Sequence, residues 1–71
     1  MVYVSIKNKL LDIRLEMGYK FQKDFAEFLG ISPYQYNRYE KNVSQPSVEI
    51  LYNISKKINK KIEDIIEVEE S

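Results

Sequence analysis

Apolar side chains recur every three to four residues along most of the chain, and short polar breaks divide this pattern into five segments. Such spacing is typical of amphipathic helices, which place one apolar face against a core. We therefore predict helices over residues 5–17, 22–29, 33–41, 47–58 and 62–66. No repeat, low-complexity tract or linker divides the 71 residues, so the sequence predicts one all-α, five-helix domain spanning residues 1–71.

The break between the second and third predicted helices is very short. Gly30 can adopt the left-handed conformation that ends a helix. Ser32 followed by Pro33 is a typical helix start, and Ile31 is expected to enter the core between the two helices. Helices joined by so tight a turn cross at a steep angle and form a helix-turn-helix unit. Such a unit projects its second helix outward, where it fits the major groove of DNA.

The first predicted helix begins with Ser5 as its N-cap and ends before Gly18. Leu11 and Leu15 form a second apolar stripe on it, wider than one small domain needs. We expect this stripe to pack under the chain termini or to form part of a subunit interface. The core-facing residues of this helix are predicted to be Ile6, Leu10, Ile13 and Met17.

The fourth predicted helix follows a turn at Asn42, a residue type that tolerates the left-handed cap almost as well as glycine. Ser47 is its expected N-cap. Its core-facing residues are predicted to be Val48, Leu51, Ile54 and Ile58.

The two ends of the chain carry strand-like patterns. Residues 1–4 (MVYV) are β-branched and aromatic, and residues 66–69 alternate apolar and acidic side chains. These segments predict a short antiparallel β-ribbon between the termini. Because an isolated pair of strands is weak without packing support, frayed ends are the alternative interpretation.

One motif runs through the second and third predicted helices, and it consists of Gln22, Phe25, Ala26, Leu29, Gly30, Ile31, Ser32, Tyr36, Arg38, Tyr39 and Glu40. With this motif, the chain resembles the phage repressor and Cro-type helix-turn-helix family, also called the XRE family. The resemblance covers residues 5–66, with matches to the family's first helix at residues 6–14, its fourth at 46–54 and its fifth at 62–66. One departure is the loop at residues 18–21, which is one residue longer than usual and has Phe21 where a small hydroxyl residue often caps the second helix.

The resemblance implies a DNA-binding regulator whose third helix contacts bases. Tyr36 and Tyr39 are three residues apart and are expected to face the core. On the outward side, a glutamine can pair bidentately with adenine and an arginine with guanine, each worth about 1–3 kcal/mol of discrimination. Arg38 could instead contact a phosphate, and Tyr34 either a thymine methyl group or a sugar-phosphate edge. The predicted base-contacting residues are Tyr34, Gln35, Asn37 and Arg38.

Residues that flank this helix are candidates for phosphate contacts, which fix the orientation of a protein on DNA without specifying sequence. The family's glutamine at the position of Gln22 contacts a phosphate and supports the third helix. The resemblance also implies a structural ion pair between Arg14 and Glu40. The predicted phosphate contacts are Gln22, Lys23, Ser32, Lys41, Asn42, Ser44 and Gln45.

The net charge is zero, which by itself argues against a nucleic-acid-binding protein. The charges are unevenly distributed, however. Residues 1–60 carry 10 basic and 6 acidic side chains, and residues 61–71 carry 1 basic and 5 acidic side chains. Since salt screens charges beyond about 8 Å, a basic body and an acidic tail can act separately. We expect modest affinity for non-specific DNA.

Several functional classes lack their usual residues. The chain has no cysteine and no histidine, so it offers no disulfide, thiolate site or imidazole base. No calcium-loop spacing, nucleophile–base pair or glycine-rich phosphate loop occurs, and no apolar run approaches membrane-spanning length. We therefore predict a non-enzymatic cytoplasmic protein without cofactor, metal or membrane contact.

A single DNA-contacting helix, such as the third predicted helix, contacts only a few base pairs. This favours a two-fold dimer on a palindromic operator. The alternative is an antitoxin or adaptor that uses the same fold to bind a protein partner. The predicted dimer contact is the surplus apolar surface formed by Leu11, Leu15, Ile62, Ile65 and Ile66, with Val2 and Tyr3 beside it.

Overall fold

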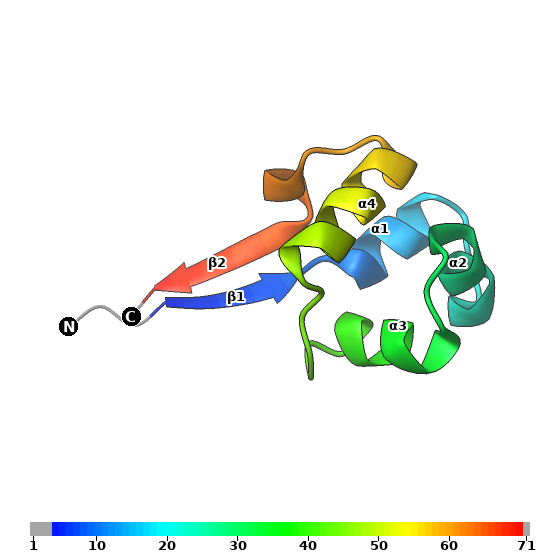
Figure 1. The fold of residues 1–71 in the computed structure, drawn as a ribbon, viewed down its shortest axis with the longest axis horizontal. Coiled ribbons are helices and arrows are strands. Elements are labelled where there is room, and N and C mark those ends of the chain that lie inside the picture. Colours follow the sequence, from blue (N-terminus) through cyan, green and yellow to red (C-terminus); the bar gives the residue numbers. More distant parts are fainter. Residues whose placement is uncertain (1–3, 71) are drawn as a thin grey trace.

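A computed structural model describes residues 4–70 of the chain, as four α-helices, one short 3-10 segment and a two-stranded ribbon (Figure 1). The helices form a rounded body, and the ribbon projects from it as an arm, which gives the molecule an elongated outline of 41 × 23 × 22 Å. The elements in chain order are β1 Val4–Asn8, α1 Leu10–Glu16, α2 Gln22–Leu29, α3 Pro33–Glu40, α4 Val48–Ile58, η1 Ile62–Asp64 and β2 Ile66–Glu70.

The helix-turn-helix unit has the predicted form. Gly30 ends α2 with a φ of +76°, and the Ser32 hydroxyl accepts a hydrogen bond from the Gln35 amide at 3.2 Å, which caps α3. Pro33 occupies the first turn, where no amide donor is needed. Phe21 precedes α2 without a side-chain cap, as its apolar side chain predicts.

The prediction for the first helix was wrong at its start. Residues 5–8 belong to β1, and α1 begins only at Leu10. Ser5 is therefore a strand residue rather than an N-cap, and Ile6 is half exposed on the ribbon instead of lying in the core. The side-chain oxygen of Asn8 accepts a hydrogen bond from the Leu10 amide at 3.1 Å, so this residue supports the start of the helix. Gly18 follows the helix with a φ of +87°, consistent with the predicted stop.

The ribbon exists, but its first strand lies further along the chain than predicted. β1 pairs antiparallel with β2, with Ile6 opposite Val68 and Asn8 opposite Ile66. Residues 1–3, which include the candidates Val2 and Tyr3, lie outside the described residues. The fifth helix is reduced to the η1 turn, because Ile66 is already part of β2.

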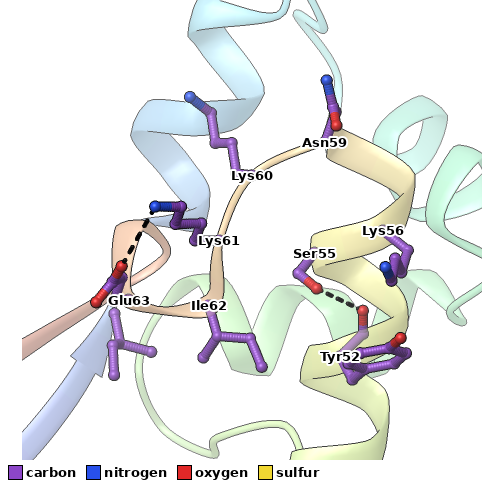
Figure 2. Close-up of a pocket in the computed structure, with 9 residues that line it drawn as sticks. Tyr52, Ser55, Lys56, Asn59, Lys60, Lys61, Ile62 and Glu63 are labelled. Atoms are coloured by element: carbon purple, nitrogen blue, oxygen red, sulfur yellow. Dashed lines mark hydrogen bonds and ion pairs between the residues drawn. The ribbon is translucent and has the colours of Figure 1, made fainter.

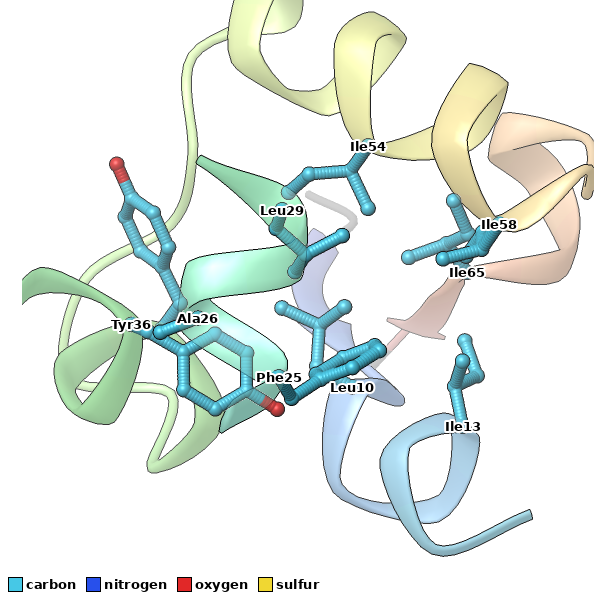
Figure 3. Close-up of a cluster of buried hydrophobic side chains, with 10 residues drawn as sticks. Leu10, Ile13, Phe25, Ala26, Leu29, Tyr36, Ile54, Ile58 and Ile65 are labelled. Atoms are coloured by element: carbon cyan, nitrogen blue, oxygen red, sulfur yellow. The ribbon is translucent and has the colours of Figure 1, made fainter. Parts of the chain in front are cut away.

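The hydrophobic core joins all four helices to Ile65, the residue between η1 and β2 (Figure 3). α4 is capped by Ser47 as predicted, and it buries Ile54 and Ile58. Val48, predicted to face the core, is 80% exposed instead, because it lies at the first position of the helix. The buried apolar side chains are Leu10, Ile13, Phe25, Ala26, Leu29, Tyr36, Tyr39, Ile54, Ile58 and Ile65.

Ile65 is fully buried in this core. Its assignment to the exposed dimer surface was therefore wrong, because its side chain already packs within one chain. Ile65 follows the η1 turn directly and precedes β2.

Candidate nucleic-acid interface

The outward face of α3 carries three of the predicted base-contacting residues. Tyr34 is 74% exposed, while Gln35 and Arg38 are partly exposed. The guanidinium carbon of Arg38 lies 6.0 Å from the ring centroid of Tyr34, one helical turn earlier. A cation near an aromatic face in this way is held in place, which limits the freedom of both side chains.

The inward face of α3 is anchored by aromatic packing. Tyr36 is fully buried, and its ring meets the edge of Phe25 with centroids 5.5 Å apart. Tyr39 is 3% exposed in the same core. Both tyrosines therefore pack as predicted, and they leave the opposite side of the helix facing outward.

The Glu40 carboxylate, in the last turn of α3, is the centre of a buried polar cluster. Arg14 donates from Nε to Oε2 at 3.0 Å and from Nη2 to Oε1 at 3.2 Å, which is a bidentate pair. Gln22 donates to Oε1 at 2.8 Å, and the Tyr36 hydroxyl donates to Oε2 at 2.5 Å. The Arg14–Glu40 pair implied by the family resemblance is thus present, and it links α1, α2 and α3.

Arg14 also fixes the loop before α2. Its Nη1 donates to the carbonyl oxygens of Tyr19 at 3.1 Å and Lys20 at 2.6 Å. The side chains of Arg14 and Glu40 are only 9% and 6% exposed, so water contributes little to solvating either charge. The guanidinium is therefore satisfied almost wholly by the protein itself.

The pKa values in this cluster favour the charged pair. Burial alone would raise the pKa of Glu40, but hydrogen bonds from Arg14, Tyr36 and Gln22 outweigh it and hold the pKa below 4.5. The hydrogen bond to Glu40 raises the pKa of Arg14 against the opposing effect of burial. Burial, together with the bond to Glu40, raises the pKa of Tyr36 far above its ordinary value. At neutral pH the cluster is an ion pair with a neutral phenol as donor.

Gln22 and Asn37 form a direct link between α2 and α3. The side-chain nitrogen of Asn37 donates to the side-chain oxygen of Gln22 at 2.9 Å, while the Gln22 nitrogen binds Glu40. Both groups of the Gln22 amide are therefore engaged within the chain. The geometry thus gives Asn37, predicted to contact bases, a positioning contact inside the protein.

A second polar cluster lies around Asn8, at the end of β1. The Asn8 side chain is buried and donates to the Tyr39 carbonyl at 2.7 Å and to the Gln45 side chain at 2.9 Å. Its backbone amide donates to the Asn42 side chain at 2.8 Å. Sequence analysis missed Asn8. Its only local signal was a short polar residue just before an apolar helical run.

The same cluster gives new roles to two predicted phosphate contacts. Asn42 has the expected left-handed backbone, with a φ of +60°, and its side-chain oxygen also accepts from Gln45 at 2.8 Å. The side-chain amides of Asn42 and Gln45 are thus both hydrogen-bonded within the chain. Lys23 and Lys41 remain exposed, and the Ser32 hydroxyl is occupied as the α3 cap. Ser44 lies partly exposed in the loop, where its backbone amide donates to the Arg38 carbonyl at 3.3 Å.

The remaining candidates for a subunit contact lie on the surface. Leu11 is 43% exposed and Leu15 is 56% exposed, and both belong to the outer side of α1. Ile62 and Ile66 are partly exposed.

A shallow hollow lies between α4 and η1 (Figure 2). Its three lysines each lie against a partner within the chain. Lys56 lies 5.3 Å from the Tyr52 ring centroid, Lys60 lies 3.8 Å from Glu16, and Lys61 lies 4.0 Å from Glu63. Across residues 4–70, no group of histidine, cysteine, aspartate or glutamate side chains could hold a metal ion. In the same part of the chain, no helix is long and apolar enough to cross a membrane.

Comparison with known proteins agrees with this geometry. The Helix-turn-helix family model matches residues 10–65, which is most of the chain. The chain therefore belongs to the Cro/C1-type helix-turn-helix family, also called the XRE family, whose members are DNA-binding regulators. No curated protein and no solved structure matches it significantly. The two strands of the ribbon flank the matched segment and lie outside it.

Proposed function

We propose that the protein is a sequence-specific transcriptional repressor that binds a palindromic operator as a homodimer, with α3 in the major groove. The observation that carries this proposal is the division of α3 into two faces. Tyr36 and Tyr39 are buried, while Tyr34, Gln35 and Arg38 lie on the outward side of the same two helical turns. A helix presented in this way can approach base edges without disturbing the core.

In this proposal the polar ends of Gln35 and Arg38 supply the base specificity. Gln35 pairs with adenine and Arg38 with guanine, because their side chains can form bidentate hydrogen bonds with those bases. Tyr34 contacts a thymine methyl group or the adjoining sugar, and its ring limits the orientations open to Arg38. Asn37 acts through Gln22, by holding α3 against α2.

Phosphate contacts come from the exposed ends of the unit. Lys23 in the first turn of α2 and Lys41 after α3 carry charge to either side of the base-contacting face. The hydroxyl of Ser44, which is partly exposed in the loop after α3, can donate to a further phosphate. Such contacts set the position of the helix on DNA and make the affinity salt-dependent.

The test is selection of bound sequences from a random duplex pool at two salt concentrations. We expect recovery of a palindrome whose half-sites are about ten base pairs apart. Arg38→Ala and Gln35→Ala should each relax the preference at one position by about 1–3 kcal/mol. Lys56→Ala is the matched control, because it also removes an exposed cation, but from α4.

Two results would contradict the proposal. Recovery of no sequence above background at low salt would remove DNA as the ligand and favour the partner-binding alternative. Equal loss of affinity in Lys56→Ala and Arg38→Ala, with the sequence preference retained in both, would show that Arg38 contributes only general charge. Repression itself is checked with a reporter gene placed behind the selected operator, whose expression should fall when the protein is present.

A further inference from the structure

The ribbon has two outer edges, and each is a candidate site for pairing with another strand. The described part of the chain forms a sheet of only β1 and β2, so neither strand has a second neighbour in that sheet. On one face of the ribbon, Ile6 and Val68 lie opposite each other and are 50% and 52% exposed. Since a lone pair of strands is marginally stable, an exposed apolar face and free edges favour further pairing.

Hydrogen bonds at the base of the ribbon show which backbone groups of β1 point outward. The Asn8 amide donates to the Asn42 side chain, and the Asn8 carbonyl accepts from that side chain at 3.5 Å. The next residue, Lys9, instead donates to the Ile65 carbonyl, toward the β2 side of the chain. Because backbone groups alternate in direction along a strand, those of Ile6 and Val4 also point to the free edge.

Charge distinguishes the two edges. On the polar face of the ribbon, β2 carries Glu67 and Glu69, whereas β1 carries Ser5 and Lys7. In antiparallel pairing of β2 with its own copy, glutamates would lie opposite glutamates, and like charges in that position are destabilising. Charged side chains of this kind are a common protection of sheet edges. The β1 strand carries no acidic side chain, so its edge lacks this repulsion.

We propose that a second copy of the chain pairs antiparallel along β1, which gives a four-stranded sheet in the order β2–β1–β1–β2. In the register that the geometry favours, Val4 exchanges backbone hydrogen bonds with Ile6 of the partner subunit, and Ser5 lies on the two-fold axis. Pairing centred on Ile6 would instead place Val4 against the partner's Asn8, whose backbone groups are already bonded to Asn42. The apolar pairs of both ribbons then form one continuous face.

This inference rests on the proposed function, because it identifies the contact that joins two base-contacting helices. Asn8 ties the end of β1 to the Tyr39 carbonyl of α3 and to the loop after it. A dimer formed through β1 therefore transmits its geometry to both copies of α3. The spacing of operator half-sites would follow from the ribbon pairing rather than from the α1 surface.

Two substitutions test the β1 edge. Ser5→Lys places a lysine opposite Glu69 within one ribbon, which favours the folded monomer, but opposite a second lysine across the dimer axis. Ile6→Pro removes the outward amide while leaving the ladder with β2 intact, since proline is tolerated where the amide faces away. Val68→Pro is the matched control on the β2 edge.

The readout is sedimentation velocity at high micromolar concentration, with circular dichroism on every variant. We expect a dimer for the wild type and Val68→Pro, and a folded monomer for Ser5→Lys and Ile6→Pro. If Ile6→Pro fails to fold, the sedimentation result for Ser5→Lys alone tests the proposal. The proposal is overturned if both β1 variants remain dimers, or if only Val68→Pro becomes a monomer. It is also overturned if the wild type is a monomer, or if it forms species larger than a dimer. The last result would indicate pairing of β1 with β2 of the next copy.

The two proposals fail separately. If sequence selection finds an operator but the β1 variants keep the wild-type mass, the DNA-binding function stands and the β1 interface is wrong. If no operator is found but Ser5→Lys dissociates a dimer, the interface stands and the DNA-binding function is wrong.

Discussion

Replacing Glu40 with alanine should destabilise the fold more than any single change on the outward face of α3. The carboxylate accepts four hydrogen bonds from three side chains, and two of these bonds come from the buried Arg14 guanidinium. Removal of one partner from a buried pair typically costs about 3–5 kcal/mol, because the other charge stays unpaired. Arg14 would keep its bonds to the Tyr19 and Lys20 carbonyls, so we expect the lower end, about 3 kcal/mol.

That loss is large for a chain of this size. A domain of 71 residues has a free energy of unfolding of roughly 4–11 kcal/mol at the usual value per residue. A loss of about 3 kcal/mol should lower the thermal midpoint by about 12–24 °C. The assay is thermal and urea unfolding followed by circular dichroism, with Gln35→Ala as the control. Because Gln35 lies on the outward face of the same helix, its replacement should leave the midpoint nearly unchanged.

A double-mutant cycle separates the ion pair from the other bonds. Arg14→Met removes the guanidinium but keeps much of its apolar stem, and the double variant with Glu40→Ala leaves neither charge unpaired. We therefore expect the double variant to lose less than the sum of the two single losses. Strict additivity, or equal midpoints for Glu40→Ala and Gln35→Ala, would refute the view that this buried pair holds the three helices together.

Two further predictions concern the polar clusters around Glu40 and Asn8. The lowered pKa of Glu40 means that its contribution to stability is present above pH 4.5 and is lost as the pH falls through the folded-state pKa. Urea titrations across the acid range should show this loss in the wild type and a flatter profile in Glu40→Gln; parallel profiles would contradict it. Asn8→Ala should cost about 2 kcal/mol, since it leaves the Leu10 amide without its acceptor and removes one of the two donors to the Tyr39 carbonyl. Unfolding midpoints measure that loss, with Asn53→Ala on the exposed side of α4 as the control.

The helix-turn-helix unit could be predicted because its signals are local. Gly30, Ser32 and Pro33 specify the end of one helix and the start of the next through their own backbone preferences. The inward tyrosines follow from helical spacing. Each of these features depends on residues only a few positions apart, so no knowledge of the rest of the fold is needed.

The first strand could not be placed by the same reasoning. Ile6, Leu10 and Ile13 have helical spacing, but Val4 and Ile6 also alternate in the manner of a strand. What decides between the two is pairing with β2, about sixty residues later in the chain. A contact of that separation overrides local preference and leaves no trace in a short window of sequence.

The amide clusters escaped prediction for a related reason. Asn42 and Gln45 follow α3 on the surface loop where phosphate contacts are expected. Their side chains accept hydrogen bonds from Asn8, which is more than thirty residues away in the sequence. Gln22 and Asn37 are likewise plausible surface residues until the crossing of α2 and α3 brings them together. These four polar positions were predicted as functional residues, but their partners were set by the tertiary fold.

The contacts of α3 show how so short a helix is held in place. Its eight residues include proline, asparagine and three tyrosines, which are weak helix formers, so the segment would hardly be helical alone. It is instead fixed by contacts along its length: the Ser32 cap at its start, Gln22 in its middle, and Glu40 and Asn8 near its end. A helix held in this way presents its outward side chains in one orientation, which reduces the ordering cost of binding. The residues that hold α3 in place are therefore mostly different from those on its outward face.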